Sequence, residues 1–158
     1  MSLVREIKFV NRAIEIAAAN AAAGLGPFGA VVVRGDEIIA EGTNQVTSTF
    51  DPTAHAEIVA IRNACDVLGS FQLTGCDLYA SCEPCPMCLG AIYWARPDRV
   101  YYASTRHDAA AAGFDDDYIY KELAVAPGDR RLEMTRIVCD EAPEPFRVWT
   151  ENGGRIPY

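Results

Sequence analysis

The sequence predicts a layered α/β domain, and three observations support this fold class. Short runs rich in valine, isoleucine and tyrosine alternate with longer stretches in which apolar residues recur every three or four positions, as strands alternate with amphipathic helices. Half of the 158 residues are hydrophobic, which is enough to form one substantial core. No repeat and no low-complexity linker divides the chain. We therefore expect residues 1–158 to form a single domain.

Five strands and six helices are expected along the chain. The strands cover residues 29–33, 37–41, 76–81, 99–103 and 136–139. The helices cover residues 3–23, 55–68, 85–94, 109–112, 118–123 and 145–149. The first helix ends at Gly24, and a tight turn at Gly35-Asp36 joins the first two strands as a hairpin. About thirty residues separate the last two strands, which permits these strands to pair in parallel. The expected sheet is mixed, with five strands and helices on both faces.

The third strand runs directly into a cysteine-rich segment, Cys82-Glu83-Pro84-Cys85-Pro86-Met87-Cys88. Cys85 and Cys88 are three residues apart, so they share one face of the helix that the two prolines introduce. The positive end of that helix, together with a metal ion, favours the thiolate over the thiol. Because zinc binds thiolates, this segment is predicted to supply two zinc ligands.

A histidine and a glutamate open the second helix, behind the turn and cap predicted at Asp51-Pro52-Thr53. His55 and Glu57 are two residues apart and point in different directions around the helix, so the spacing suits one ligand and one neighbouring carboxylate. Two cysteines and one histidine leave the fourth tetrahedral position open, as in catalytic zinc sites. Zinc lowers the pKa of a bound water to about 7, and Glu57 can then carry its proton. Both helix starts follow strands, where open α/β sheets bind ligands.

A closed structural zinc site and a redox pair are the alternatives for Cys-x-x-Cys. A closed site would need Cys82 as its fourth ligand, whereas we expect Cys82 to end the strand and point elsewhere. The joint presence of the histidine and cysteine motifs favours the catalytic interpretation.

Charge and composition limit the class of substrate and the compartment. The net charge is −8, and the 14 basic residues are scattered, whereas nucleic-acid binders usually carry a basic stripe. A small neutral substrate is therefore expected, with no nucleic acid. No apolar run approaches ~20 residues, so no membrane span is expected, and the first residues lack the pattern of a signal peptide. Cysteines beyond the two metal-binding ones are expected to be free thiols, which favours a cytoplasmic location.

The paired motifs, His-x-Glu and Pro-Cys-x-x-Cys, match the signature of zinc-dependent nucleobase deaminases. The chain resembles the cytidine-deaminase superfamily and, over nearly its whole length, looks most like the bacterial guanine deaminases within it. The narrower resemblance rests on Gly26–Ala30, Asp51–Glu57, Ser81–Arg96, Gly113–Asp116, Ile119–Glu122 and Tyr158. It implies a three-layer cytidine-deaminase-like fold, with Zn²⁺ bound by His55, Cys85 and Cys88 and with Glu57 as the catalytic proton shuttle.

The same resemblance implies a set of substrate-binding residues. They are Asn44, Asp116, Phe28, Ala56, Trp94 and Tyr158. Asn44 and Asp116 would hydrogen-bond the purine edge, and Phe28 would stack on the base against the His55 ring. By residue type alone, Asn44 could instead hold a turn, Asp116 could belong to a solvated acidic face, and Phe28 could be core.

A homodimer is also implied by the resemblance, because the family exchanges its C-terminal segments between subunits. Residues from about 130 to 158 would cross over, and Tyr158 would close the partner's pocket. By residue type alone, Tyr158 could equally be a frayed end.

The expected reaction is hydrolytic deamination of guanine to xanthine and ammonia, with Glu57 protonating ring N3 and then the leaving amine. A tRNA-specific adenosine deaminase has nearly the same core motifs, but the acidic charge and the Gly113–Asp116 segment count against it. His55 in place of a third cysteine counts against free cytidine as the substrate. Another small aminopurine or an amino-triazine stays open. A zinc-stabilised binding module without catalysis is disfavoured because Glu57 is intact.

Overall fold

The structure is a computed structural model that describes residues 3–158. It divides into two compact units, Met1–Lys121 and Glu122–Tyr158, and each is described by itself. The first unit contains the whole β-sheet and the helices that pack on it. The second unit contains the end of the helix Asp116–Ala124, a short 3₁₀ helix and one further α-helix, and the residues between the last two belong to no helix or strand.

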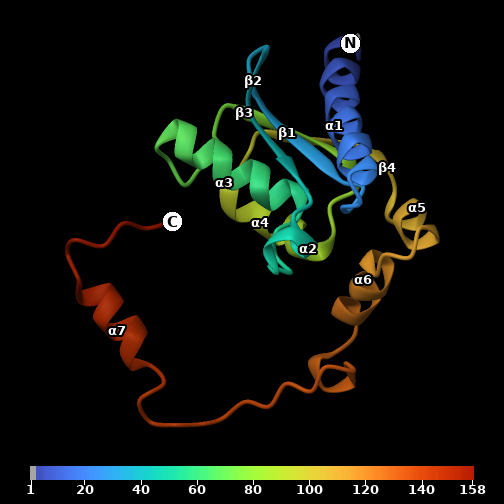
Figure 1. The fold of residues 1–158 in the computed structure, drawn as a ribbon. Helices are drawn as coiled ribbons and strands as arrows, with labels where there is room; N and C mark the ends of the chain where they lie inside the picture. Colours follow the sequence, from blue (N-terminus) through green and yellow to red (C-terminus); the bar gives the residue numbers. More distant parts are fainter. Residues whose placement is uncertain (1–2) are drawn as a thin grey trace. The chain divides into compact units, whose positions relative to one another are not determined.

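A four-stranded mixed sheet forms the centre of the first unit, in the order β2-β1-β3-β4 (Figure 1). The strands are β1 (Gly29–Arg34), β2 (Glu37–Thr43), β3 (Cys76–Cys82) and β4 (Arg99–Ser104). β1 pairs antiparallel with β2 and with β3, and β3 pairs parallel with β4. The predicted hairpin is confirmed, and its turn residue Gly35 has a φ of 61°, a conformation that glycine adopts readily.

Helices cover both faces of this sheet, as predicted. The helices of the whole chain are α1 (Val4–Ala22), α2 (Val46–Thr49), α3 (Ala56–Leu68), α4 (Pro86–Ala95), α5 (Arg106–Ala111), α6 (Asp116–Ala124), η1 (Pro127–Asp129) and α7 (Glu144–Glu151). In the part of the chain that the structure describes, no helix has the length and apolar character needed to cross a membrane.

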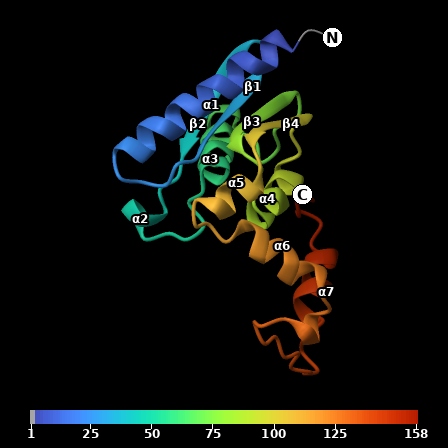
Figure 2. The same ribbon diagram turned by 90° about the vertical axis from the view of Figure 1, so that its right-hand side faces the viewer.

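The core is split into two layers by the alternation of side chains along the strands. Val31 and Val33 point to one face, where they pack with Phe9 of α1 and Tyr79 of β3. The residues on the other face pack against α3 and α4, and they include Ala30, Val32, Leu78 and Ala80. Figure 2 shows α1 on one side of the sheet and α3 and α4 on the other. The first unit is therefore a three-layer α/β/α structure.

The predicted fifth strand at residues 136–139 is wrong. These residues form no strand, and Ile137 and Val138 are 77% and 78% exposed. An apolar β-branched run indicates a preference for a sheet, but a strand forms only where a neighbouring strand meets its N–H and C=O groups. Within the described chain no strand pairs with this segment, and β4 pairs only with β3.

A close approach between β2 and α3 fixes the start of the helix that carries His55 and Glu57. A Cβ atom on Gly42 would overlap the carbonyl oxygen of Ala56 and the backbone nitrogen of Ala60. Only glycine permits this contact between the two backbones. The backbone of β2 therefore contacts the first turn of α3 directly and fixes its position.

Candidate active site

The site lies at one edge of the sheet, where the chain enters β1 and leaves β2, β3 and β4. Gly29 at the start of β1 pairs with Thr43 at the end of β2, so Phe28 and Asn44 lie next to each other. Their backbones are also joined, because the Asn44 N–H donates to the Phe28 carbonyl oxygen at 3.2 Å. β3 ends at this edge too and leads into the cysteine segment.

The three predicted metal ligands meet at this edge. His55 is the N-cap of α3, Cys85 is the N-cap of α4, and Cys88 lies in the first turn of α4. The Cys85 Sγ and Cys88 Sγ atoms lie 3.5 Å and 3.6 Å from the His55 Nδ1 atom. The three ligand atoms lie within 4.8 Å of one another, and among the described residues this is the group that could hold a metal ion.

Zinc fits this donor set in geometry and in chemistry. Zn–S and Zn–N bonds of about 2.3 Å and 2.1 Å at tetrahedral angles would separate sulfur from nitrogen by about 3.6 Å. The observed sulfur-to-nitrogen distances of 3.5 Å and 3.6 Å agree with this value. Two thiolates and an imidazole are ligands that zinc prefers, and three protein ligands leave one position for a reactant.

The two thiols differ in how readily they ionise. A hydrogen bond from Cys88, reinforced by His55, lowers the pKa of the Cys85 thiol far below its ordinary value. The pKa of Cys88 is raised, because this thiol donates to Cys85 and is buried. The pair therefore carries one negative charge readily, and a bound cation would favour the second ionisation.

Glu57 lies beside the metal ligands, on the first turn of α3, and is only 7% exposed. Burial raises the pKa of its carboxyl group to about 7. A group with a pKa near neutral can both accept and donate a proton at physiological pH, as a general acid/base must. The position and the protonation behaviour of Glu57 both suit the predicted proton shuttle.

A cavity of about 200 Å³ opens directly onto Glu57 and His55. Its lining residues are Phe28, Asn44, Val46, Thr47, His55, Glu57, Phe114 and Asp116. Five of these were predicted as site residues from the sequence. Val46, Thr47 and Phe114 were not: the first two lie on the short helix α2, in a segment where no helix was predicted. The only indication for Phe114 in the sequence was its place in Gly113–Asp116, one of the segments that carry the family resemblance.

Asn44 is held so that its amide group faces the cavity in a defined orientation. Its Oδ1 atom accepts a hydrogen bond from the Val46 N–H at 3.2 Å, which leaves the Nδ2 group to donate to a ligand. Its backbone carbonyl accepts a bond from Asn20 Nδ2 at 2.9 Å, and the same Asn20 group donates to Gly26 O at 2.7 Å. Gly26 has no side chain because a Cβ atom there would lie 2.7 Å from the Asn44 Cγ atom.

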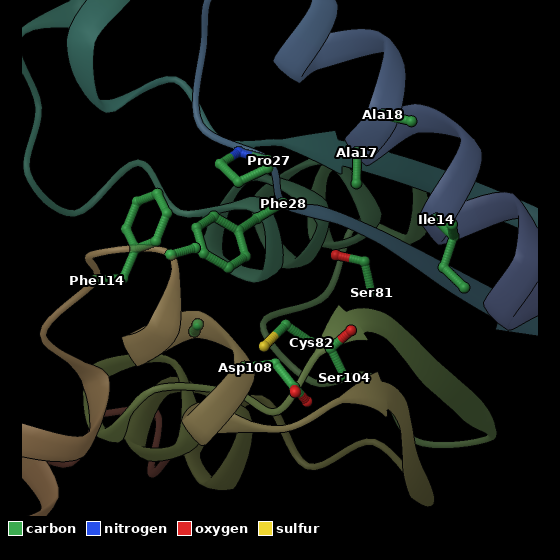
Figure 3. Close-up of a pocket in the computed structure, with 12 residues that line it drawn as sticks. Ile14, Ala17, Ala18, Pro27, Phe28, Ser81, Cys82, Ser104, Asp108 and Phe114 are labelled. Carbon is green, nitrogen blue, oxygen red and sulfur yellow. The ribbon is translucent and has the colours of Figure 1, made fainter.

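Two phenylalanines separate this cavity from a second one. The rings of Phe28 and Phe114 meet edge to face, with centroids 4.8 Å apart and an interplanar angle of 79°. The second cavity, of about 280 Å³, lies between α1 and α5, and both rings line it as well (Figure 3). Cys82 lines this second cavity, with its Sγ atom 3.4 Å from the Thr105 carbonyl oxygen. The prediction that Cys82 points away from the metal ligands is confirmed.

Asp116 supplies the second carboxylate of the substrate cavity, from the first residue of α6. Burial, and then the negative charge on Cys85, raise the pKa of its carboxyl group. Asp116 lines the same cavity as Glu57 and His55, where the oxygens of its carboxylate can accept hydrogen bonds from a ligand.

Three residues with a predicted substrate role do not line this cavity. Ala56 is fully buried between His55 and Glu57, where it packs in the core beneath the site. Trp94 lies on α4 and is 63% exposed. Tyr158 belongs to the second unit, where its ring lies 6.3 Å from the Trp149 ring. Substrate contacts by these three residues remain predictions.

Comparison with known proteins agrees with the geometry. Residues 4–104 match the family model described as the cytidine and deoxycytidylate deaminase zinc-binding region. The guanine deaminase of Bacillus subtilis is 52% identical over 151 residues, which cover 95% of this chain and 97% of that protein. The crystal structure of the Bacillus subtilis protein superposes with a TM-score of 0.93 over 96% of this chain and 97% of the other.

Two further relatives are more distant. The structure of the guanine deaminase from Nitrosomonas europaea is 36% identical and has a TM-score of 0.65, over 68% of this chain and 63% of the other. The tRNA-specific adenosine deaminase of Haemophilus influenzae is 40% identical over 70% of this chain and 67% of that protein. The zinc-ligand geometry, the family match and the near full-length similarity lead to one conclusion. The chain belongs to the zinc-dependent cytidine and deoxycytidylate deaminase family, and within it to the guanine deaminases.

Proposed function

We propose that the protein hydrolyses guanine to xanthine and ammonia. One observation carries this proposal: a single cavity joins the zinc-ligand triad and the buried Glu57 to two polar side chains, Asn44 and Asp116, that can bind a purine edge. The 52% identity with the Bacillus subtilis guanine deaminase, over nearly the full length of both chains, supports the choice of guanine.

The chemistry requires a nucleophile and a proton carrier at the ring carbon C2. Zinc held by His55, Cys85 and Cys88 would supply the Lewis acidity that makes water a nucleophile near neutral pH. Glu57 takes a proton from the attacking water and delivers it to ring N3. It then moves the proton of the new C2 hydroxyl group to the exocyclic amine, so that the C2–N bond breaks, a C2=O bond forms and ammonia leaves. A carboxyl group with a pKa of about 7 is suited to both transfers.

Recognition of the base is assigned to three side chains of the cavity. The Asp116 carboxylate accepts hydrogen bonds from the N1–H and the amine of guanine, whereas adenine has no proton on N1. The Asn44 amide donates to an acceptor on the purine edge, since its oxygen is already bonded to the Val46 N–H. Phe28 stacks on one face of the base, and its ring is braced edge-on by Phe114.

A homodimer with exchanged C-terminal segments is part of the proposal. The unit Glu122–Tyr158 exposes several large apolar residues, and a unit shorter than ~40 residues rarely buries enough surface to be stable alone. The exposed residues include Leu132, Ile137, Val138 and Phe146. Among the residues of the first unit that the structure describes, β4 pairs on one side only. These features support residues 130–158 completing a second copy of the chain, with Tyr158 closing that copy's cavity.

A cytoplasmic location is proposed from the cysteines. All six lie in the described part of the chain and are free thiols, which suits a reducing compartment.

An RNA substrate is disfavoured by charge, although the Haemophilus influenzae relative acts on tRNA according to its name. Binding of a phosphate backbone relies on clustered lysine and arginine. This chain carries a net charge of −8, and the acidic run Asp115–Asp117 lies at the start of α6 beside the cavity.

Ammonia release from guanine, adenine, cytosine, cytidine and adenosine, measured side by side, tests the proposed function. Guanine should have the highest kcat/KM, with a preference over adenine of ~10⁴-fold, because a site that pairs buried polar groups rejects a mismatched base. The preference should weaken in Asp116→Ala. A wild-type protein that prefers adenine or cytosine would refute the assignment.

A further inference from the structure

Tyr120 belongs to the Ile119–Glu122 segment that carries part of the family resemblance, yet none of these described residues lines the substrate cavity. The Tyr120 hydroxyl donates a hydrogen bond to the Pro84 carbonyl oxygen at 2.8 Å. Pro84 directly precedes Cys85, so this bond acts on the peptide group that leads into a zinc ligand. The two residues are 36 positions apart, which makes the bond a link between α6 and the cysteine segment.

The same helix carries Asp116 one turn before Tyr120. Residues four positions apart on a helix lie on the same face, so one face of α6 presents a carboxylate to the cavity and a hydroxyl to the cysteine segment. A rotation or shift of α6 that moved the Asp116 carboxylate would also break the bond to Pro84. The bond therefore fixes the position of Asp116 relative to the zinc ligands.

A second contact holds Tyr120 in this arrangement. The Arg106 guanidinium lies over the Tyr120 ring, 4.5 Å from its centroid. The backbone N–H of Arg106 donates to Glu83 Oε2 at 3.0 Å, and the Glu83 N–H donates to Ser104 O at 2.8 Å. Arg106 of α5 thus binds Glu83, and Tyr120 of α6 binds Pro84. The stacking of Arg106 on the Tyr120 ring connects these two contacts.

We propose that Tyr120 is a positioning residue for base recognition. Through its bond to Pro84 it holds the Asp116 carboxylate at a fixed place relative to the zinc-binding cysteines, and so it determines how strongly the site prefers one base. This inference rests on the proposed pairing of Asp116 with the purine edge. Tyr120 is neither a lining residue of the cavity nor one of the three metal ligands, so it acts on binding rather than on the chemical step.

A double-mutant cycle tests this role. Tyr120→Phe removes only the hydroxyl and keeps the ring under Arg106. We expect kcat/KM for guanine to fall about tenfold, mainly through a higher KM, as the loss of one hydrogen bond would cause. The preference for guanine over adenine should fall with it, while zinc per chain stays at the wild-type value. In the Asp116→Ala background the same change should cost less than about twofold, because the two residues act as one unit.

Tyr93→Phe is the matched control, since Tyr93 lies on α4 and is 77% exposed. Its kinetics should equal those of the wild type. Unchanged kinetics in Tyr120→Phe, loss of its zinc, or an equal loss in both backgrounds would each overturn the inference. Measuring the cycle with a panel of bases distinguishes a failure of the role of Tyr120 from a failure of the proposed guanine activity. If the wild type works best on another base, the cycle measured with that base still decides the role of Tyr120, and a wild type inactive on every base overturns both proposals.

Discussion

At the scale of single residues, the environment of Glu57 differs from that of the exposed carboxylates elsewhere in the chain. The side chain is buried beside two thiols and an imidazole, and burial raises its pKa to about 7. An exposed glutamate stays ionised at neutral pH and cannot deliver a proton to a ring nitrogen. Placement in the first turn of α3 thus gives an ordinary carboxyl group the protonation behaviour of a shuttle.

The variant Glu57→Gln should keep its zinc and lose turnover. Glutamine preserves the size and the hydrogen-bonding shape of the side chain but cannot carry a proton, so kcat for guanine should fall at least ~10²–10⁴-fold. Glu122→Gln serves as the control and should have wild-type activity. Near-normal turnover in Glu57→Gln, measured together with zinc content, would mean that a different carboxylate carries the proton.

Several site residues were predictable from the sequence because their spacing already specifies the chemistry. Cys85 and Cys88 share a helix face at a separation of three, and the structure places both beside His55. Phe114 and Thr47 were not predictable in this way, since they reach the cavity only because segments far apart in the sequence meet at one edge of the sheet. The spacing of residues along the chain carries no information about such tertiary contacts.

At the scale of elements, the predicted strands and helices of residues 3–104 agree with the structure apart from their ends and the missed helix α2. The helices α1, α3 and α4 bury residues against the sheet, and the strands contribute side chains to the core on both of its faces. The α5 helix begins earlier than predicted, at Arg106, because Thr105 and Asp108 form a capping box. The prediction of the fifth strand was wrong because the sequence of a segment shows its preference for strand structure but does not show whether a neighbouring strand is available to pair with it.

The contact of β2 with α3 at Gly42 predicts opposite effects for two glycine-to-alanine changes. Gly42→Ala places a methyl group against the α3 backbone, so the free energy of unfolding should fall by about 1–3 kcal/mol. Gly90→Ala, within α4, meets no atom within 4 Å and should leave stability unchanged or raise it by up to about 1 kcal/mol. Denaturant unfolding of both variants measures these changes in the free energy of unfolding. A Gly42→Ala protein as stable as the wild type would show that the backbones can separate without cost.

At the scale of the whole molecule, the proposed exchange of C-terminal segments makes the active unit a dimer. Deletion of residues 156–158 should leave the fold and the zinc content intact but lower guanine turnover, because an element that closes the cavity is lost. Glu57→Gln chains and tail-deleted chains, each impaired alone, should partly recover activity when they are refolded together. In some mixed dimers one cavity then has both an intact Glu57 and a tail donated by the other chain.

Two outcomes would contradict the exchange. A tail-deleted protein as active as the full chain would mean that Tyr158 has no role in the site. A mixture that never recovers, although size measurements show mixed dimers, would mean that the tail acts on its own chain.

The most direct test of the central claim is ammonia release from guanine by the protein stripped of metal and then titrated with zinc. The His55, Cys85 and Cys88 donors suit one zinc ion with an open position. Stripping should therefore abolish ammonia release, and activity should return in proportion to added zinc until about one ion per chain is bound. Guanine turnover that survives complete metal removal, or a fully reloaded protein that releases no ammonia from guanine, would contradict the assignment of this site as a zinc-dependent guanine deaminase.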